Sequence, residues 1–189
     1  ALMEKEPKIA RHLHIPLQSG SDEVLARMGR PYDTQQFEKR VEMIRSKIPD
    51  VSISTDVIVG FPMESEEAFA ETLCTCKRVG FSFLHVFPYS KRSGTKAASM
   101  DGQIKGDVKK ARAKALITLS EELLLAYKKQ FIGKTLSVLF ERVQDGIAIG
   151  HSSEYLQVGA DASLVSKFCD VSITHLSKEG ILIGNAKEV

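Results

Sequence analysis

Residues 9–130 alternate between apolar β-type runs and amphipathic helical stripes, and this alternation limits the possible folds more than any other feature. Strands are expected at Ile9–Leu17, Val51–Val59 and Phe83–Pro88. Each of them is followed by a segment with helical periodicity. Such alternation gives right-handed βαβ units and a parallel sheet. The sequence therefore predicts an α/β fold for this part of the chain.

The helix signals in this part are local and specific. Asp33 or Thr34 can cap a helix that ends near Lys47, and Ser65 can cap one that Gly80 terminates. The four helices are expected at 22–28, 34–47, 66–79 and 107–130. Three strand–helix units are too few for a complete barrel, which needs eight, or about six in a partial barrel. We therefore expect the chain to be the C-terminal part of a longer protein.

From Lys134 onward the hydrophobic period changes to two, which is typical of strands with one buried face. Five short strands are expected at 135–142, 146–151, 155–158, 167–175 and 180–186. Strands of this number and length predict a small antiparallel β-barrel of OB-like size. The expected domains are residues 1–132 and residues 133–189.

Polar groups, glycines and aromatic rings collect where the three parallel strands end. The candidate ligand-binding residues are Gln18, Ser19, Gly20, Asp56, Gly60, Phe61, Pro62, Phe87 and Tyr89. The C-terminal ends of parallel strands meet at one edge of a sheet, where ligands bind. Aromatic and polar groups together suit an adenine and a ribose. The alternative is that these are ordinary turn and capping residues, and the spacing alone leaves both interpretations open.

Composition excludes several other classes. The chain has 189 residues, a net charge of +2 and three cysteines, so neither a strongly basic protein nor a disulfide framework is indicated. No apolar run reaches the about 18 residues of a membrane span, so we expect a cytoplasmic protein without a membrane partner. His12 and His14 share a strand face but have no third ligand nearby, so no metal site is predicted. The run from Lys109 to Lys114, which includes Arg112, is interpreted as a solvated helix face.

Three motifs together resemble one known family. They are HLHIPLQSGSDEVLARMGRPY, DVIVGFPMESEEAFAETL and LHVFPYSKRSGTKAASM, and they follow each other at the family's separations. They are similar to the MiaB-like radical S-adenosylmethionine methylthiotransferases, most of all to the branch that acts on threonylcarbamoyladenosine. The stretch from KTLSVLFE to ILIGNAK resembles the TRAM domain of that family. Met63 stands where the family usually has glycine.

The resemblance implies an enzyme, its cofactors and its partners. The whole protein would add a methylthio group to C2 of a modified adenosine next to the tRNA anticodon. It would use S-adenosylmethionine, two 4Fe-4S clusters and a 5′-deoxyadenosyl radical. The cluster motif C-x-x-x-C-x-x-C is not found in this chain, so the chain alone should bind no cluster and be inactive. The implied partners are tRNA and the missing N-terminal domains; catalytic residues stay unassigned.

The resemblance assigns the strand-end residues to S-adenosylmethionine, and basic or aromatic positions to RNA. The RNA candidates are Lys91, Arg92, Lys134, Arg142, Tyr155 and Lys167. Lysine and arginine would contact phosphates, and Tyr155 would stack on a base. Three alternatives stay open: a non-catalytic RNA-binding module, a methylthiotransferase acting on a ribosomal protein, and an unrelated cofactor-binding α/β enzyme.

Overall fold

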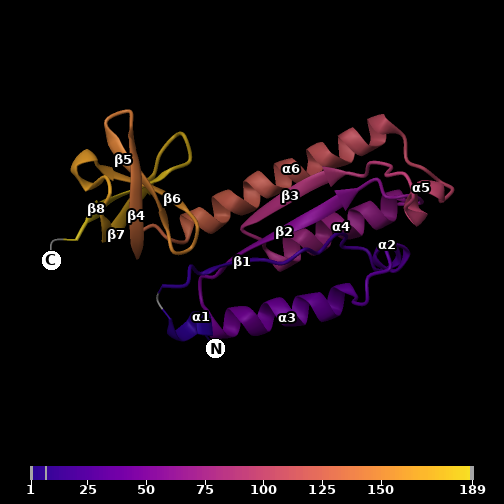
Figure 1. The fold of residues 1–189 in the computed structure, drawn as a ribbon, viewed down its shortest axis with the longest axis horizontal. Coiled ribbons are helices and arrows are strands. Elements are labelled where there is room, and N and C mark those ends of the chain that lie inside the picture. The colour runs from indigo at the N-terminus through magenta and orange to yellow at the C-terminus, as the bar shows by residue number, and fades with distance from the viewer. Residues whose placement is uncertain (1, 7, 188–189) are drawn as a thin grey trace. The chain divides into compact units, whose positions relative to one another are not determined.

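The computed structural model describes residues 2–6 and 8–187, which form two compact units (Figure 1). One unit contains Leu13–Ser46 and Ile53–Leu123. The other contains the described residues up to His12, together with Lys47–Ser52 and the chain from Leu124 onward. The predicted boundary between residues 132 and 133 stays a prediction, because each unit is assembled from several segments. No described helix is long and apolar enough to cross a membrane.

The first of these units is built on a small parallel sheet. Its strands are β1 (His12–His14), β2 (Ser52–Val59) and β3 (Phe83–Pro88), in the order β1-β2-β3. Strands β2 and β3 pair in parallel, with Asp56 opposite His85. Strand β2 is buried along almost its whole length, as expected for a parallel strand covered on both faces. The predicted parallel sheet is confirmed.

The predicted first strand, Ile9–Leu17, is much shorter in the structure. Only His12–His14 is regular strand, and Gln18 rejoins the sheet through an isolated parallel bridge to Val57. Pro16 has no N–H to donate, and Gln18 adopts a φ of 68°, which an extended strand does not allow. The segment between the two pairings lies along β2 without continuous ladder bonds.

The helices are close to their predicted positions. They are α1 (Leu2–Lys5), α2 (Asp22–Arg27), α3 (Thr34–Lys47), α4 (Glu66–Val79), α5 (Lys96–Ser99) and α6 (Gly106–Lys129). Helix α4 has both predicted end signals. The Ser65 hydroxyl accepts the Ala68 N–H, and Gly80 ends the helix with a φ of 64°. The short helices α1 and α5 were not predicted.

Five strands form a closed barrel in the second unit, as predicted, and a 3₁₀ turn, η1 (Ala162–Leu164), lies between two of them. The strands are β4 (Thr135–Gln144), β5 (Ile147–Ser152), β6 (Gln157–Asp161), β7 (Phe168–Leu176) and β8 (Leu182–Ala186). Their order around the barrel is β4-β5-β6-β8-β7. One pairing differs from the expected antiparallel arrangement, because β6 and β8 run parallel. Fully buried Val138, Phe140 and Val158 belong to the barrel core.

Candidate cofactor site

A pocket of about 580 Å³ lies at the C-terminal ends of β2 and β3. The predicted site residues that line it are Gln18, Asp56, Phe87, Tyr89 and Arg92. Backbone bonds place them beside each other: Gln18 donates to the Asp56 carbonyl and Tyr89 donates to the Val59 carbonyl, each at 2.8 Å. The structure therefore brings residues from three motifs, far apart in the chain, to one edge of the sheet.

The Asp56 carboxylate is held by a histidine. Its Oδ1 lies 3.3 Å from Nε2 of His14, whose other ring nitrogen lies 3.0 Å from the Ser54 hydroxyl. The Asp56 side chain is 29% exposed, so it keeps free acceptor capacity toward the pocket. No metal site was predicted at His14, and its contact with Asp56 gives it a supporting role for that carboxylate.

Tyr89 gives the pocket an aromatic wall with a polar end. Its ring meets the Phe61 ring edge-on, with centroids 5.3 Å apart. Among the described residues its buried hydroxyl has no hydrogen-bond partner. Buried hydroxyls are normally satisfied, so this one is a donor and acceptor available to a ligand. An adenine and ribose therefore fit the residues present: rings from Phe87 and Tyr89, acceptors from Asp56 and an amide from Gln18.

The other predicted cofactor residues shape the loops instead of lining the pocket. Ser19 is fully buried, and its hydroxyl lies 3.3 Å from the Thr72 hydroxyl on α4. A Cβ on Gly20 would come 2.7 Å from the Thr72 Cα, so only glycine allows this close packing. The Gly60 N–H donates to Glu64 at 2.6 Å. The carbonyl of Pro62 faces a guanidinium nitrogen of Arg27 at 3.5 Å.

A buried ion pair, which the sequence pattern did not predict, supports this loop. Arg112 was expected on a solvated helix face, but it is only 5% exposed and binds fully buried Glu64 at 2.6 Å. Its second terminal nitrogen binds Glu66 at 2.6 Å. Burial raises the pKa of Glu64 above its usual range, although the Gly60 N–H and Arg112 oppose that shift. The burial of Arg112 could have been predicted from its spacing to Ala113 and Leu116, because all three residues lie on the buried face of α6.

The RNA candidates are distributed over both units. Lys91 is exposed and Arg92 lines the strand-end pocket, whereas Arg142 and Lys167 are exposed on the barrel. Lys134 is already engaged, since its ammonium lies 2.7 Å from Asp50 and 5.2 Å from the centroid of the Phe131 ring. These positions do not form one continuous set, so their role stays a prediction.

Tyr155 has ring partners within the chain. Its ring stacks on His12 with centroids 4.7 Å apart and on His151 with centroids 5.6 Å apart. The side chain is still 63% exposed. An RNA base would therefore have to extend or replace an existing stack.

The cysteines do not have the arrangement that an iron–sulfur cluster needs. Cys74 is exposed, Cys76 is buried and Cys169 is partly buried on β7 of the other unit. Within residues 2–6 and 8–187, no three histidine, cysteine or acidic side chains converge as a metal-binding group. The groups at the strand-end pocket fit S-adenosylmethionine, whereas the absence of a cluster from this chain stays a prediction.

Comparison with known proteins defines the class. The family model for the radical SAM superfamily matches residues 2–75. The fold resembles coproporphyrinogen III oxidase (HemN) from Escherichia coli, a radical SAM enzyme, with a TM-score of 0.52 and 17% identity. That likeness covers 87% of this chain and 41% of the oxidase chain, and it supports the fold alone. Residues 2–75 therefore match the radical SAM superfamily.

More similar relatives define the family. The chain is 39% identical over 180 residues to the threonylcarbamoyladenosine tRNA methylthiotransferase MtaB of Thermotoga maritima, covering 95% of this chain and 42% of that protein. It is 37% identical over 182 residues to the tRNA-2-methylthio-N(6)-dimethylallyladenosine synthase of Aquifex aeolicus, covering 94% and 41% respectively. The chain belongs to the MiaB-like methylthiotransferase family, and it spans about two fifths of the length of these curated relatives.

Proposed function

We propose that the chain is part of a tRNA methylthiotransferase that adds a methylthio group to C2 of a modified adenosine beside the anticodon. The observation that carries the proposal is the strand-end pocket, which joins Gln18, Asp56 and Tyr89 in a chain of this family. The similarity to MtaB favours threonylcarbamoyladenosine as the modified base. The reaction belongs in the cytoplasm, where it would meet tRNA.

In this proposal the strand-end residues hold S-adenosylmethionine. Asp56 accepts hydrogen bonds from the ribose hydroxyls, and His14 keeps its carboxylate oriented. Phe87 and Tyr89 flank the adenine, while Gln18 offers its amide to the polar end of the ligand. Bound S-adenosylmethionine, with its clusters, supplies the radical chemistry of the family. The cluster cysteines and the N-terminal domains would come from the remainder of the protein, and this chain alone would be inactive.

The proposal is tested by S-adenosylmethionine binding to the intact protein. Asp56→Ala removes a charged acceptor and should weaken binding about tenfold or more, because such a hydrogen bond contributes about 1.5–3 kcal/mol. Asp101→Ala, at an exposed aspartate outside the pocket, serves as the control. Calorimetry measures affinity and circular dichroism verifies folding. Unchanged affinity in folded Asp56→Ala protein would reject the assignment of this pocket.

The tRNA reaction needs a separate measurement. Mass spectrometry of tRNA from cells lacking the protein, before and after complementation, should show gain of the methylthio group on threonylcarbamoyladenosine. Gain on the dimethylallyl-modified base would assign the other tRNA branch. Modification of a ribosomal protein without any change in tRNA would replace the proposed substrate.

A further inference from the structure

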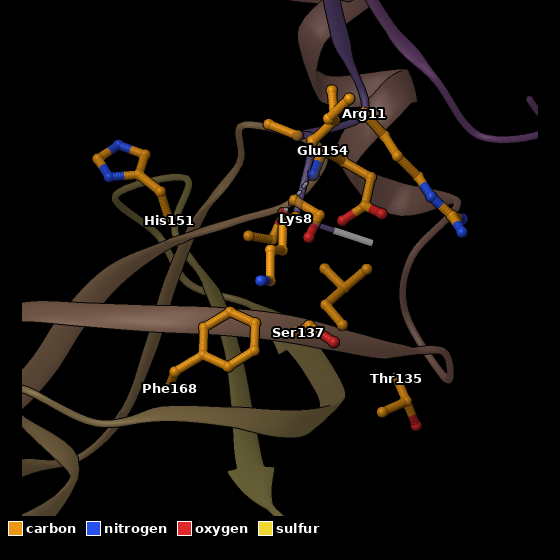
Figure 2. A pocket seen from close by; sticks show the side chains of 12 residues that line it. Lys8, Arg11, Thr135, Ser137, His151, Glu154 and Phe168 are labelled. Atoms are coloured by element: carbon orange, nitrogen blue, oxygen red, sulfur yellow. Dashed lines mark hydrogen bonds between the residues drawn. The ribbon is translucent and has the colours of Figure 1, made fainter. Parts of the chain in front are cut away.

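A second pocket lies in the unit that contains the barrel, and the proposed reaction does not use it. It has a volume of about 760 Å³, within the range of small-ligand sites. Its walls come from the N-terminal segment 8–11, the start of β4, the β5–β6 turn and the start of β7 (Figure 2). The Arg11 N–H donates to the Ser153 carbonyl at 2.6 Å, which fixes this segment to the barrel.

Glu154 is the unexplained group in this pocket. It is only 6% exposed, and among the described residues its Oε2 is buried without a hydrogen-bond partner. Figure 2 shows its carboxylate directed into the space that Lys8, Ser137 and Phe168 also line. A buried acceptor without a donor is costly unless a ligand supplies one. The ligand must therefore present an N–H or O–H group at this point.

The remaining lining groups limit the ligand further. Lys8 and Arg11 are exposed cations, which would bind phosphate and repel a lysine or arginine side chain. The Phe168 ring is 68% exposed and offers a stacking surface. These groups match the parts of a nucleotide. The carboxylate would accept from an amino group on the base, the two cations would bind phosphate, and the exposed ring would stack on the face of the base.

We propose that this pocket binds one unpaired RNA nucleotide whose base carries an exocyclic amino group. Glu154 accepts from that amino group, Phe168 stacks on the base, and Lys8 and Arg11 contact its phosphates. Uracil is disfavoured, because the N3–H donor on its pairing edge lies between two carbonyl oxygens that would approach the carboxylate, whereas an exocyclic amino group can donate without that repulsion. This inference rests on the proposed function for the RNA, but it assigns a base-reading role to residues outside the cofactor site.

The test compares two single-stranded RNA heptamers, oligo(C) and oligo(U), by fluorescence anisotropy with the intact protein. Oligo(C) should bind about tenfold tighter, the discrimination expected of one well-placed base contact. Glu154→Gln should bring the ratio close to one, because an amide can donate to uracil as well as accept from cytosine. Phe168→Ala should weaken both RNAs about equally, by roughly fivefold or more.

Matched controls separate the pocket from general effects. Glu121→Gln changes the same charge on an exposed helix position, and Val143→Ala removes a 49% exposed apolar side chain from β4. Neither should change the ratio. Because Phe168 is exposed, Phe168→Ala keeps the inference testable if Glu154→Gln does not fold.

The outcomes distinguish this inference from the proposed function. If tRNA is methylthiolated but the wild-type protein binds both heptamers equally, or Glu154→Gln leaves their ratio unchanged, the pocket does not read a base. If the selectivity follows Glu154 but no tRNA is methylthiolated, the base pocket stands and the proposed reaction fails.

Discussion

At the residue scale, left-handed backbone conformations occur at both candidate sites. Gln18 has a φ of 68° beside the strand-end pocket, and Tyr155 has a φ of 63° directly after Glu154. Such conformations cost a non-glycine residue about 1–2 kcal/mol. They persist where the surrounding structure fixes them, and they cluster at ligand sites. At Gln18 two backbone hydrogen bonds to β2 provide that support: its N–H donates to the Asp56 carbonyl, and its carbonyl accepts from the Ile58 N–H.

Met63 also has a left-handed backbone conformation. Its φ is 63° and its side chain is 53% exposed, so the side chain adds little packing to offset the strain. Met63→Gly should raise the free energy of unfolding by about 0.5–1 kcal/mol. The control is Met43→Gly, at an exposed position in α3, which should lower it by about 1 kcal/mol. Urea denaturation measures both, and destabilisation by Met63→Gly would contradict the strain argument.

The cysteines should react in the order of their exposure. Burial raises the pKa of Cys76 to about 12, so its thiolate is scarce at pH 8 and reagents cannot reach it. Exposed Cys74 should be alkylated by iodoacetamide first, and Cys76 only after unfolding in urea. Peptide mass spectrometry measures the sites. Rapid alkylation of Cys76 in the folded protein would show that α4 opens readily.

At the element scale, Arg112 connects α6 to the loop after β2 and to the first turn of α4. Removing one partner of a buried pair leaves the other charge uncompensated, which costs about 3–5 kcal/mol. Arg112→Met should therefore lower the free energy of unfolding by that amount. Lys110→Met, at an exposed position of the same helix, should change it by less than about 0.5 kcal/mol. Equal effects of the two variants in thermal denaturation would show that the pair contributes little.

The same pair predicts a pH dependence. Because burial raises the folded-state pKa of Glu64 above its ordinary 4.5, the folded state binds this proton more tightly than the unfolded state. The stabilisation is complete below about pH 4.5 and is lost as the pH rises through the folded-state pKa. The stability of the wild type relative to Glu64→Gln should therefore fall between pH 4 and neutral pH. Glu66→Gln, at a 75% exposed side chain, is the control, and a rise with pH would contradict this direction.

The period of the hydrophobic residues predicted most helices and strands. The two wrong predictions, the length of the first strand and the pairing of β6, have physical causes. Alternating apolar positions identified β2, β3 and the barrel strands, while Ser65 and Gly80 fixed the ends of α4. The length of the first strand was overestimated, because its apolar pattern continues across Pro16. The backbone hydrogen-bond ladder cannot continue there, since proline has no N–H. The parallel pairing of β6 with β8 joins segments separated by β7, and residue pattern carries no signal for such a choice of partner.

At the scale of the whole molecule, parallel topology made the position of the strand-end pocket predictable. Asp56, Phe87 and Tyr89 could be placed together because neighbouring parallel strands end at one edge. Burial was harder to predict. Ser19, a predicted ligand residue, is fully buried with its hydroxyl beside the Thr72 hydroxyl on α4, and Arg112 was expected on a solvated face but is buried. The sequence pattern did not single out Glu154. Its importance comes from segment 8–11, which is far from it in sequence.

Binding to tRNA by the whole protein should depend on salt through Arg142 and Lys167. Backbone hydrogen bonds between Phe140 and residues 166–167 place Lys167 beside the β4 bulge that precedes Arg142, so the two positions lie near each other on the barrel. Each phosphate contact contributes about 0.7–0.9 to the slope of log affinity against log salt. The double variant Arg142→Ala/Lys167→Ala should therefore reduce that slope by about 1.5.

Lys134→Ala is the matched control, because its ammonium is already paired with Asp50. Filter binding between about 50 and 200 mM salt measures the slopes. An unchanged slope in the double variant would place the phosphate contacts elsewhere, whereas a loss with Lys134→Ala alone would mean that RNA displaces the Asp50 pair.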